Sequence, residues 1–137
     1  MSFLENCFTN TQQEKTYLFS NVTVLGLEAI TSEDIYRIIN GEEPSNSYNA
    51  EVDPAAFIDS SLTVNKEEGC IFLTFNGQSA KMTYSEVNIL GNGLHDCVLR
   101  LENGEVVTDN AYIFDEESDT HIVFSNSDPL RLALVYK

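Results

Sequence analysis

The stretch CIFLTFNGQSAKM, residues 70–82, indicates the fold more clearly than any other part of this chain. At its centre is Asn76-Gly77, a dipeptide that strongly favours a two-residue hairpin turn because both residues tolerate positive φ. A turn there sorts apolar pairs to one face and more polar pairs to the other: Leu73 with Ala80 and Ile71 with Met82, against Thr74 with Ser79 and Phe72 with Lys81. We therefore predict a half-buried antiparallel hairpin.

The same period-two alternation continues toward the C-terminus. A second Asn-Gly dipeptide, at residues 103–104, predicts another hairpin with two facing pairs, Leu101 with Val106 and Leu99 with Thr108. The inward pattern weakens after these pairs, where we expect a bulge. The last apolar segment, residues 130–136, carries apolar side chains on both faces. Such a strand is expected to be central or paired, because an exposed apolar edge would aggregate.

The N-terminal half has a mixed pattern. An extended apolar stretch at residues 17–27 precedes a helix that Thr31 or Ser32 can cap and that Gly41 can end. Its buried face is predicted from the spacing of three isoleucines, Ile35, Ile38 and Ile39. Asp53-Pro54 indicates the start of a second short helix.

These patterns predict an α+β fold in a single domain, residues 1–137, with a mixed N-terminal part to about residue 60 and a β meander over residues 62–137. We expect a predominantly antiparallel β meander of six to eight strands, forming a sandwich or partial barrel, with one or two short helices in the N-terminal half. A chain of this length with 42% hydrophobic residues buries enough surface to fold without disulfides or a metal.

Charge excludes several classes of partner. The chain has 22 Asp and Glu against 7 Lys and Arg, a net charge of -15. Such a surface repels phosphate backbones and anionic lipids, so we expect no direct binding to nucleic acid or membrane. A basic signal-peptide region is absent from the N-terminal sequence, and the apolar runs are too short to span a bilayer. With three cysteines that lack close spacing, these features predict a cytoplasmic protein.

The acidic residues are concentrated in two windows of the sequence. Residues 28–59 contain eight acids and one base, and residues 102–119 contain seven acids and no base. We therefore hypothesise a small acidic inhibitor or immunity-type protein that occupies the basic, nucleic-acid-binding face of a partner protein, as a nucleic-acid mimic would. The predicted partner-binding residues are Glu42, Glu43, Tyr48, Glu51, Glu102, Glu105, Asp109, Asp115, Glu116, Glu117 and Asp119, with Tyr48 as an aromatic anchor.

Three alternatives remain open at this stage. One is a structural or adaptor β-domain with homotypic contacts, in which case the chain forms a homo-oligomer. The others are a small ligand bound inside the curled sheet and an enzymatic activity. A deep pocket with convergent polar groups would favour these last two.

No group of residues has the spacing of a known catalytic or metal site. His95, Cys97 and His121 lack the paired ligands of structural zinc, so we expect a packed Cys97 and a surface His95. The acidic run at residues 115–119 lacks the order of an EF-hand loop and is expected to be a solvated turn. We therefore predict no enzymatic activity, no metal and no cofactor.

Overall fold

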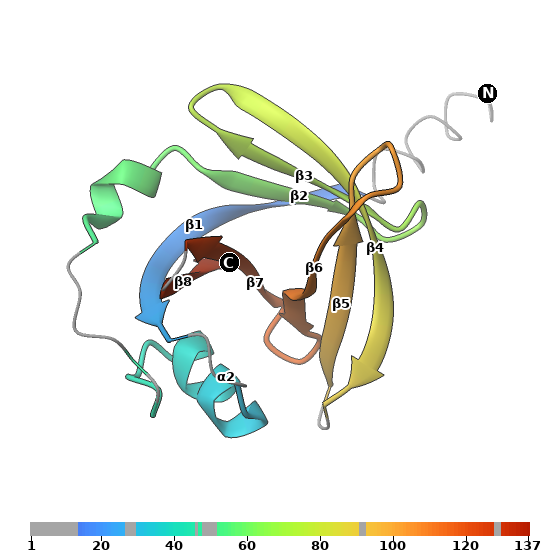
Figure 1. The fold of residues 1–137 in the computed structure, drawn as a ribbon. Coiled ribbons are helices and arrows are strands. Elements are labelled where there is room, and N and C mark those ends of the chain that lie inside the picture. Colours follow the sequence, from blue (N-terminus) through green and yellow to red (C-terminus); the bar gives the residue numbers. More distant parts are fainter. Residues whose placement is uncertain (1–13, 27–29, 46, 48–51, 91–92, 128–129) are drawn as a thin grey trace, which may run out of the picture.

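Eight antiparallel strands close into a barrel (Figure 1) in the part of the chain that the computed structural model describes, residues 14–26, 30–45, 47, 52–90, 93–127 and 130–137. Strands that follow one another in sequence pair with each other, and β1 also pairs with β8. The strands are β1 (Glu14–Leu25), β2 (Ser61–Asn65), β3 (Cys70–Phe75), β4 (Gln78–Ile89), β5 (Leu94–Arg100), β6 (Val106–Asp115), β7 (Thr120–Ser127) and β8 (Leu130–Tyr136).

This architecture confirms the prediction of a mostly antiparallel β fold with a short helix in the N-terminal half. It is also more specific than the predicted sandwich or partial barrel, because the barrel is closed. Closure depends on β1, which pairs with β2 through Glu14–Leu18 and with β8 through Phe19–Leu25. A strand from the N-terminal half thus joins the two ends of the meander.

The hairpin predicted at Asn76-Gly77 is confirmed in its register. Both turn residues have positive φ, 53° and 78°, as a two-residue turn of this type requires. All four predicted pairs are present: Leu73 with Ala80, Ile71 with Met82, Thr74 with Ser79 and Phe72 with Lys81. Ile71 and Met82 are buried in the barrel, so the predicted apolar face is the inner one.

The second hairpin differs from its prediction by one residue. Val106 lies opposite Arg100, not Leu101, although Leu99 does pair with Thr108. The reason is the turn: only Gly104 has positive φ, and the Gly104 N–H donates to the Leu101 carbonyl in a longer connection. A separate register shift lies between the pairs Cys97 with Tyr112 and Leu99 with Thr108, and it confirms the predicted bulge.

Both helical predictions are confirmed. Helix α2 (Ser32–Ile39) is capped by Thr31, whose hydroxyl accepts from the Asp34 N–H, and it ends before Gly41 at φ 77°. The 3-10 helix η1 (Pro54–Phe57) is capped by Asp53, whose carboxylate accepts from the Ala55 N–H. In the described part of the chain, no helix is both long and apolar enough to cross a membrane.

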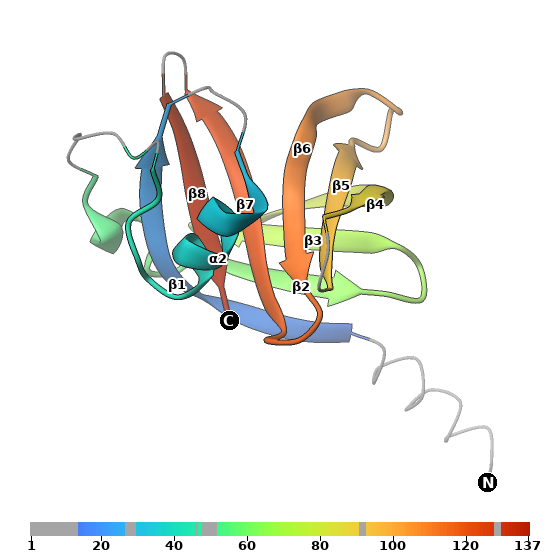
Figure 2. The same cartoon turned by 90° about the horizontal axis from the view of Figure 1, so that it is seen from below.

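Two apolar layers lie on opposite sides of the barrel wall. The inner layer includes Leu134 and Tyr136, and the outer layer places Ala133 and Val135 beneath α2 with its three isoleucines. Figure 2 shows α2 lying across the outside of the strands near β7 and β8. The prediction that the last strand is paired is confirmed, because β8 pairs with both β1 and β7.

The wall is incomplete between β6 and β7. These strands pair only through Tyr112–Asp115 and Thr120–Val123, although β6 begins at Val106 and β7 continues to Ser127. Beyond the paired ends they diverge, as Figure 2 shows. We call this divergence the β6–β7 seam. Residues on both sides of this seam, Val107 in β6 and Val123 in β7, line the cavity described below.

Candidate functional site

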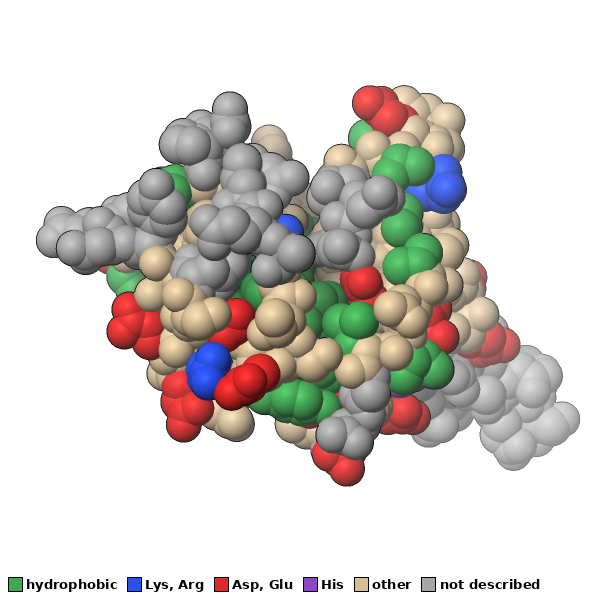
Figure 3. All heavy atoms as spheres, turned by 60° about the horizontal axis from the view of Figure 1, so that its bottom comes forward, with side chains coloured by type: hydrophobic (Ala, Val, Ile, Leu, Met, Phe, Trp, Pro, Cys, Tyr) green, Lys and Arg blue, Asp and Glu red, His purple; other side chains and the backbone are tan. Residues whose placement is uncertain are grey.

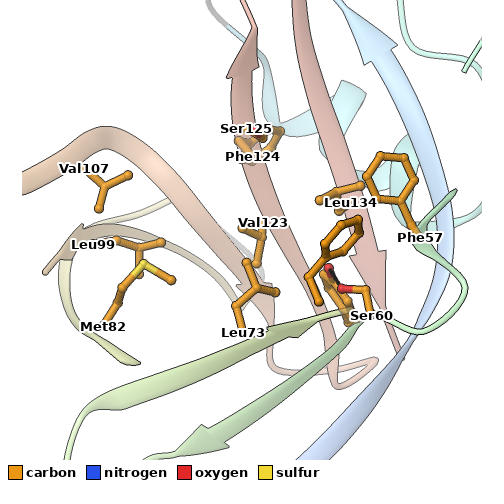
Figure 4. A pocket seen from close by; sticks show the side chains of 12 residues that line it. Phe57, Ser60, Leu73, Met82, Leu99, Val107, Val123, Phe124, Ser125 and Leu134 are labelled. Atoms are coloured by element: carbon orange, nitrogen blue, oxygen red, sulfur yellow. Dashed lines mark hydrogen bonds between the residues drawn. The ribbon is translucent and has the colours of Figure 1, made fainter. Parts of the chain in front are cut away.

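The principal feature of the interior is a cavity of about 470 Å³. Figure 4 shows its side chains converging from several strands on one space, with Val107, Leu99 and Met82 on one side and Val123 and Leu134 on the other. Its described lining is Phe57, Ser60, Leu73, Phe75, Met82, Leu99, Val107, Val123, Phe124, Ser125, Leu134 and Tyr136. Nine of these twelve are apolar or aromatic without a hydroxyl, and the three others carry hydroxyl groups.

Strand alternation positions most of these side chains. Successive residues of a strand point to opposite faces, so every second residue enters the barrel. Val123 therefore faces inward while its neighbour Ile122 packs in the outer layer under α2. Val107 and the residues of β7 lie on the two sides of the β6–β7 seam, so the cavity reaches this opening.

The cavity has an apolar mouth at one end of the barrel. Phe75 and Val107 line the cavity and remain 37% and 44% exposed, and Leu101 nearby is 39% exposed. In Figure 3, hydrophobic side chains follow one lobe of the surface and continue into the hollow beside it. Apolar side chains at an opening are typical of sites that bind apolar ligands or partners.

The opposite end of the barrel is filled by aromatic rings. Tyr17, Tyr112 and His121 are each no more than 3% exposed. The rings of Tyr17 and His121 lie 4.1 Å apart, and Phe114 stacks on His121 at 5.7 Å. Among the described residues, these side chains fill the interior at this end, and the cavity lies toward the mouth and the β6–β7 seam.

Polar partners within this aromatic end set the charge of His121. Its Nε2 lies 3.4 Å from Asp119 Oδ1, so this nitrogen carries the proton of the neutral ring. Its Nδ1 then accepts from the Tyr112 hydroxyl at 2.6 Å. Burial lowers the pKa of His121 to about 4, although the Asp119 carboxylate opposes this shift. The imidazole is therefore uncharged at neutral pH.

Asp119 binds two further groups in the same place. Lys15 Nζ donates to Asp119 Oδ2 at 2.6 Å, and the Tyr17 hydroxyl donates to Oδ1 at 2.7 Å. Burial alone would raise the pKa of Asp119, but these hydrogen bonds, with the one from His121, lower it to about 2. The negative charge of Asp119 is thus balanced by Lys15 and by the hydrogen bonds from Tyr17 and His121. This predicted partner-binding residue therefore has a structural role.

The floor of the cavity carries a pair of hydroxyls. Ser60 Oγ and Tyr136 Oη lie 2.7 Å apart, and the two residues are 3% and 0% exposed. Both residues line the cavity. Burial raises the pKa of Tyr136, so its hydroxyl stays protonated. The floor is therefore polar but uncharged.

The structure places the predicted partner-binding acids in three separate regions. Glu102 and Glu105 lie in the exposed β5–β6 hairpin at the mouth end, and residues 115–119 lie in the β6–β7 turn at the other end. Leu94 lies opposite Asp115 and Arg100 lies opposite Val106, so these two ends of β6 are about 20 Å apart at the usual rise per residue. Glu42 and Glu43 line a separate surface hollow beside β1. Figure 3 likewise shows acidic side chains in several places on one face.

Two residues of the β6–β7 turn have surroundings that differ from the predicted solvated turn. Asp115 is 4% exposed, not solvated, because its carboxylate accepts from the Ser118 hydroxyl at 2.6 Å and folds the turn back on itself. Glu116 accepts from His95 at 3.2 Å and Glu117 is exposed. Tyr48 and Glu51 lie outside the described residues, and of Asp109 only the strand position in β6 is described.

Like His121, the other two residues considered for metal binding, Cys97 and His95, have structural surroundings. Cys97 is fully buried as predicted, and burial raises the pKa of its thiol to about 12. His95, predicted at the surface, is only partly exposed, at 17% of its side chain: its ring stacks on Phe114 at 4.5 Å and hydrogen-bonds Glu86 and Glu116. Within the described part of the chain, no three His, Cys, Asp or Glu side chains are placed to hold a metal ion.

Comparisons of the chain with protein-family models, with curated proteins and with solved structures find no match. The function must therefore be argued from the site itself. The cavity residues were not among the predicted site residues, because apolar alternation indicates a buried face and does not show whether that face is filled. The available signal was the inward parity of Leu73, Leu99 and Leu134 around a curled sheet.

Proposed function

We propose that this protein binds a small apolar molecule inside its barrel. The observation that carries the proposal is the cavity of about 470 Å³, which is open at an apolar mouth and closed at the aromatic end. Ligand sites typically occupy about 300–1,000 Å³ and combine apolar walls with a few polar groups. An eight-stranded barrel is wide enough to hold one small ligand. The proposal is one of binding, without catalysis.

A matched pair of substitutions tests this proposal. Val106 and Val107 are adjacent in β6 and similarly exposed, at 40% and 44%, but only Val107 lines the cavity. We expect Val107→Asp to weaken binding of the apolar dye Nile red by about tenfold or more, because the dye would bury a carboxylate without a partner. Val106→Asp should bind the dye as the unmodified protein does.

The measurement is a fluorescence titration, since Nile red emits strongly only in apolar surroundings. Thermal unfolding of both variants controls for differences in stability. The proposal is wrong if the unmodified protein does not bind the dye, or if the two variants lose affinity equally.

A second proposal is the acidic inhibitor of a basic, nucleic-acid-binding partner protein. What supports it is the exposure of six of the predicted residues, Glu42, Glu43, Glu102, Glu105, Glu116 and Glu117. Their separation means that a partner would have to contact more than one side of the barrel, or only one of the pairs. A pull-down washed at low and at high salt tests this proposal, because charge-led binding weakens as salt rises.

We also propose a cytoplasmic location. Its support is the state of Cys70 and Cys97, which are buried as free thiols on separate strands. Reduced cysteines are typical of cytoplasmic proteins. Fractionation of the native cells tests it, and recovery outside the cytoplasm would contradict it.

A further inference from the structure

The hydroxyl pair on the cavity floor has one proton more than its own hydrogen bond uses. Ser60 and Tyr136 each carry one O–H, and the single bond between Oγ and Oη uses one of the two protons. In the described part of the chain, each hydroxyl forms its side-chain hydrogen bond with the other. Both groups are almost fully buried, and a buried donor without an acceptor is unfavourable. The second proton is therefore available to an acceptor inside the cavity.

Charged groups are absent from the described lining of the cavity, which consists of apolar side chains and hydroxyls. The nearest inward-facing imidazole, His121, lies opposite Tyr136 across the β7–β8 ladder and is neutral. Arg131 stacks on the ring of Phe124 at 5.3 Å and does not itself line the cavity. An anionic head group on the floor would find no cation there.

The surroundings of the mouth also disfavour an anion. Glu102 and Glu105 are exposed in the hairpin that follows Leu99. Arg100, in the same hairpin, donates to the Gly104 carbonyl. With a net charge of -15 on the whole chain, the long-range field repels anions as they approach. We therefore expect an apolar chain that ends in a carboxylate to bind in this cavity more weakly than a neutral molecule of similar size.

We propose that the ligand is a neutral apolar molecule with one hydrogen-bond acceptor, such as an ester or ketone oxygen, which the Ser60–Tyr136 pair binds on the floor. This inference rests on the proposed function, because it names the ligand class of the same cavity. The apolar part of the molecule then lies against Leu99, Val123 and Leu134. A fatty acid of the same length is excluded by its charge and not by its size.

The test compares three probes with the same hydrocarbon chain by displacement of Nile red at neutral pH: methyl decanoate, decanoate and decane. The ester and the acid anion differ mainly in charge, and the ester and the alkane differ in the acceptor. We expect the ester to bind about tenfold more tightly than decanoate, and about fivefold more tightly than decane, the gain of one neutral hydrogen bond.

A double variant, Ser60→Ala with Tyr136→Phe, tests the role of the floor. Both hydroxyls must be removed together, because either one alone could still donate its proton to the ligand. Replacing both partners by apolar groups of similar shape is close to neutral for folding. We expect the double variant to bind decane at least as tightly as before and to lose the preference for the ester.

The outcomes distinguish the proposed function, ligand binding in the cavity, from the proposed ligand class, a neutral molecule with an acceptor. If Nile red fails to bind the unmodified protein, the proposed function is wrong and the ligand class falls with it. If Nile red binds but decanoate competes as well as the ester, the cavity binds ligands and the neutral class is wrong. If the ester keeps its advantage over decane in the double variant, the hydroxyl pair is not its binding group and the inference is overturned.

Discussion

Acid should destabilise this protein through His121 while most carboxylates are still ionised. The imidazole is 1% exposed, and its pKa falls from 6.5 to about 4 on folding because burial disfavours the charged form. Protonation would also place a second N–H at Nδ1, where the Tyr112 hydroxyl now donates. Between these two pKa values the unfolded chain binds the proton and the folded barrel does not.

The sign and size follow from linkage. A group whose pKa is depressed by folding contributes its full stability above the unfolded pKa and loses it as the pH falls toward the folded pKa. The fall of the His121 pKa from 6.5 to about 4 corresponds to about 3 kcal/mol. We therefore expect the free energy of unfolding to fall by about 1.4 kcal/mol for each pH unit in the middle of this range.

His95 changes the pH dependence of stability in the opposite direction, so the experiment needs a variant that lacks this imidazole. Burial lowers its pKa, but hydrogen bonds to Glu86 and Glu116 outweigh burial and leave the pKa raised overall. Its contribution to stability is thus present below its unfolded pKa and is lost as the pH rises through its raised pKa. Because the chain has only two histidines, His95→Gln isolates His121.

The assay is urea unfolding of the His95→Gln variant across this pH range, together with NMR titration of the remaining imidazole. The NMR signal measures the folded pKa directly, so it separates His121 from carboxylates that begin to titrate at the acid end. An imidazole that titrates near 6.5 in the folded protein would refute the reasoning. So would a free energy of unfolding that stays constant across the range.

Three further predictions concern the turns, the caps and the thiols. Thr31→Ala removes the side-chain acceptor of the Asp34 N–H and should lower the free energy of unfolding by about 1 kcal/mol in urea, whereas the exposed Thr16→Ala should change it less. Gly77→Ala forces a Cβ into a residue at φ 78° and should cost about 1 kcal/mol by the same measurement; since no heavy atom lies within 4 Å of that Cβ, a much larger loss would contradict backbone strain as the cause. Cys70 and Cys97 are at most 1% exposed with raised thiol pKa values, so mass spectrometry after treatment with Ellman's reagent should find them modified only once the protein is unfolded.

Local sequence signals predicted local structure well. Asn76-Gly77 determined a register of four pairs, because a two-residue turn leaves the strands no other alignment. Thr31 and Gly41 determined where α2 begins and ends, because they satisfy backbone groups at the helix termini. The one-residue error at the second hairpin arose because Asn103-Gly104 adopts a longer turn with only the glycine at positive φ.

The predicted surface was less accurate than the predicted strands. Net charge and its two windows are properties of the sequence, but the distance between charges depends on the path of the chain. Asp115 and Asp119 are close to Glu105 in sequence and far from it in space, since β6 lies between them. Asp119 is also held by Lys15, a residue from the other end of the chain. Such contacts have no local pattern.

The sequence by itself determined that this chain forms antiparallel hairpins with an apolar face and one capped helix, because turn chemistry and strand alternation act over a few residues. Only the tertiary structure decided that β1 and β8 close the barrel and that β6 and β7 diverge. It also decided that one end fills with aromatic rings while the other retains a cavity. Packing volume depends on side chains brought together from six strands, and no short stretch of sequence contains that information.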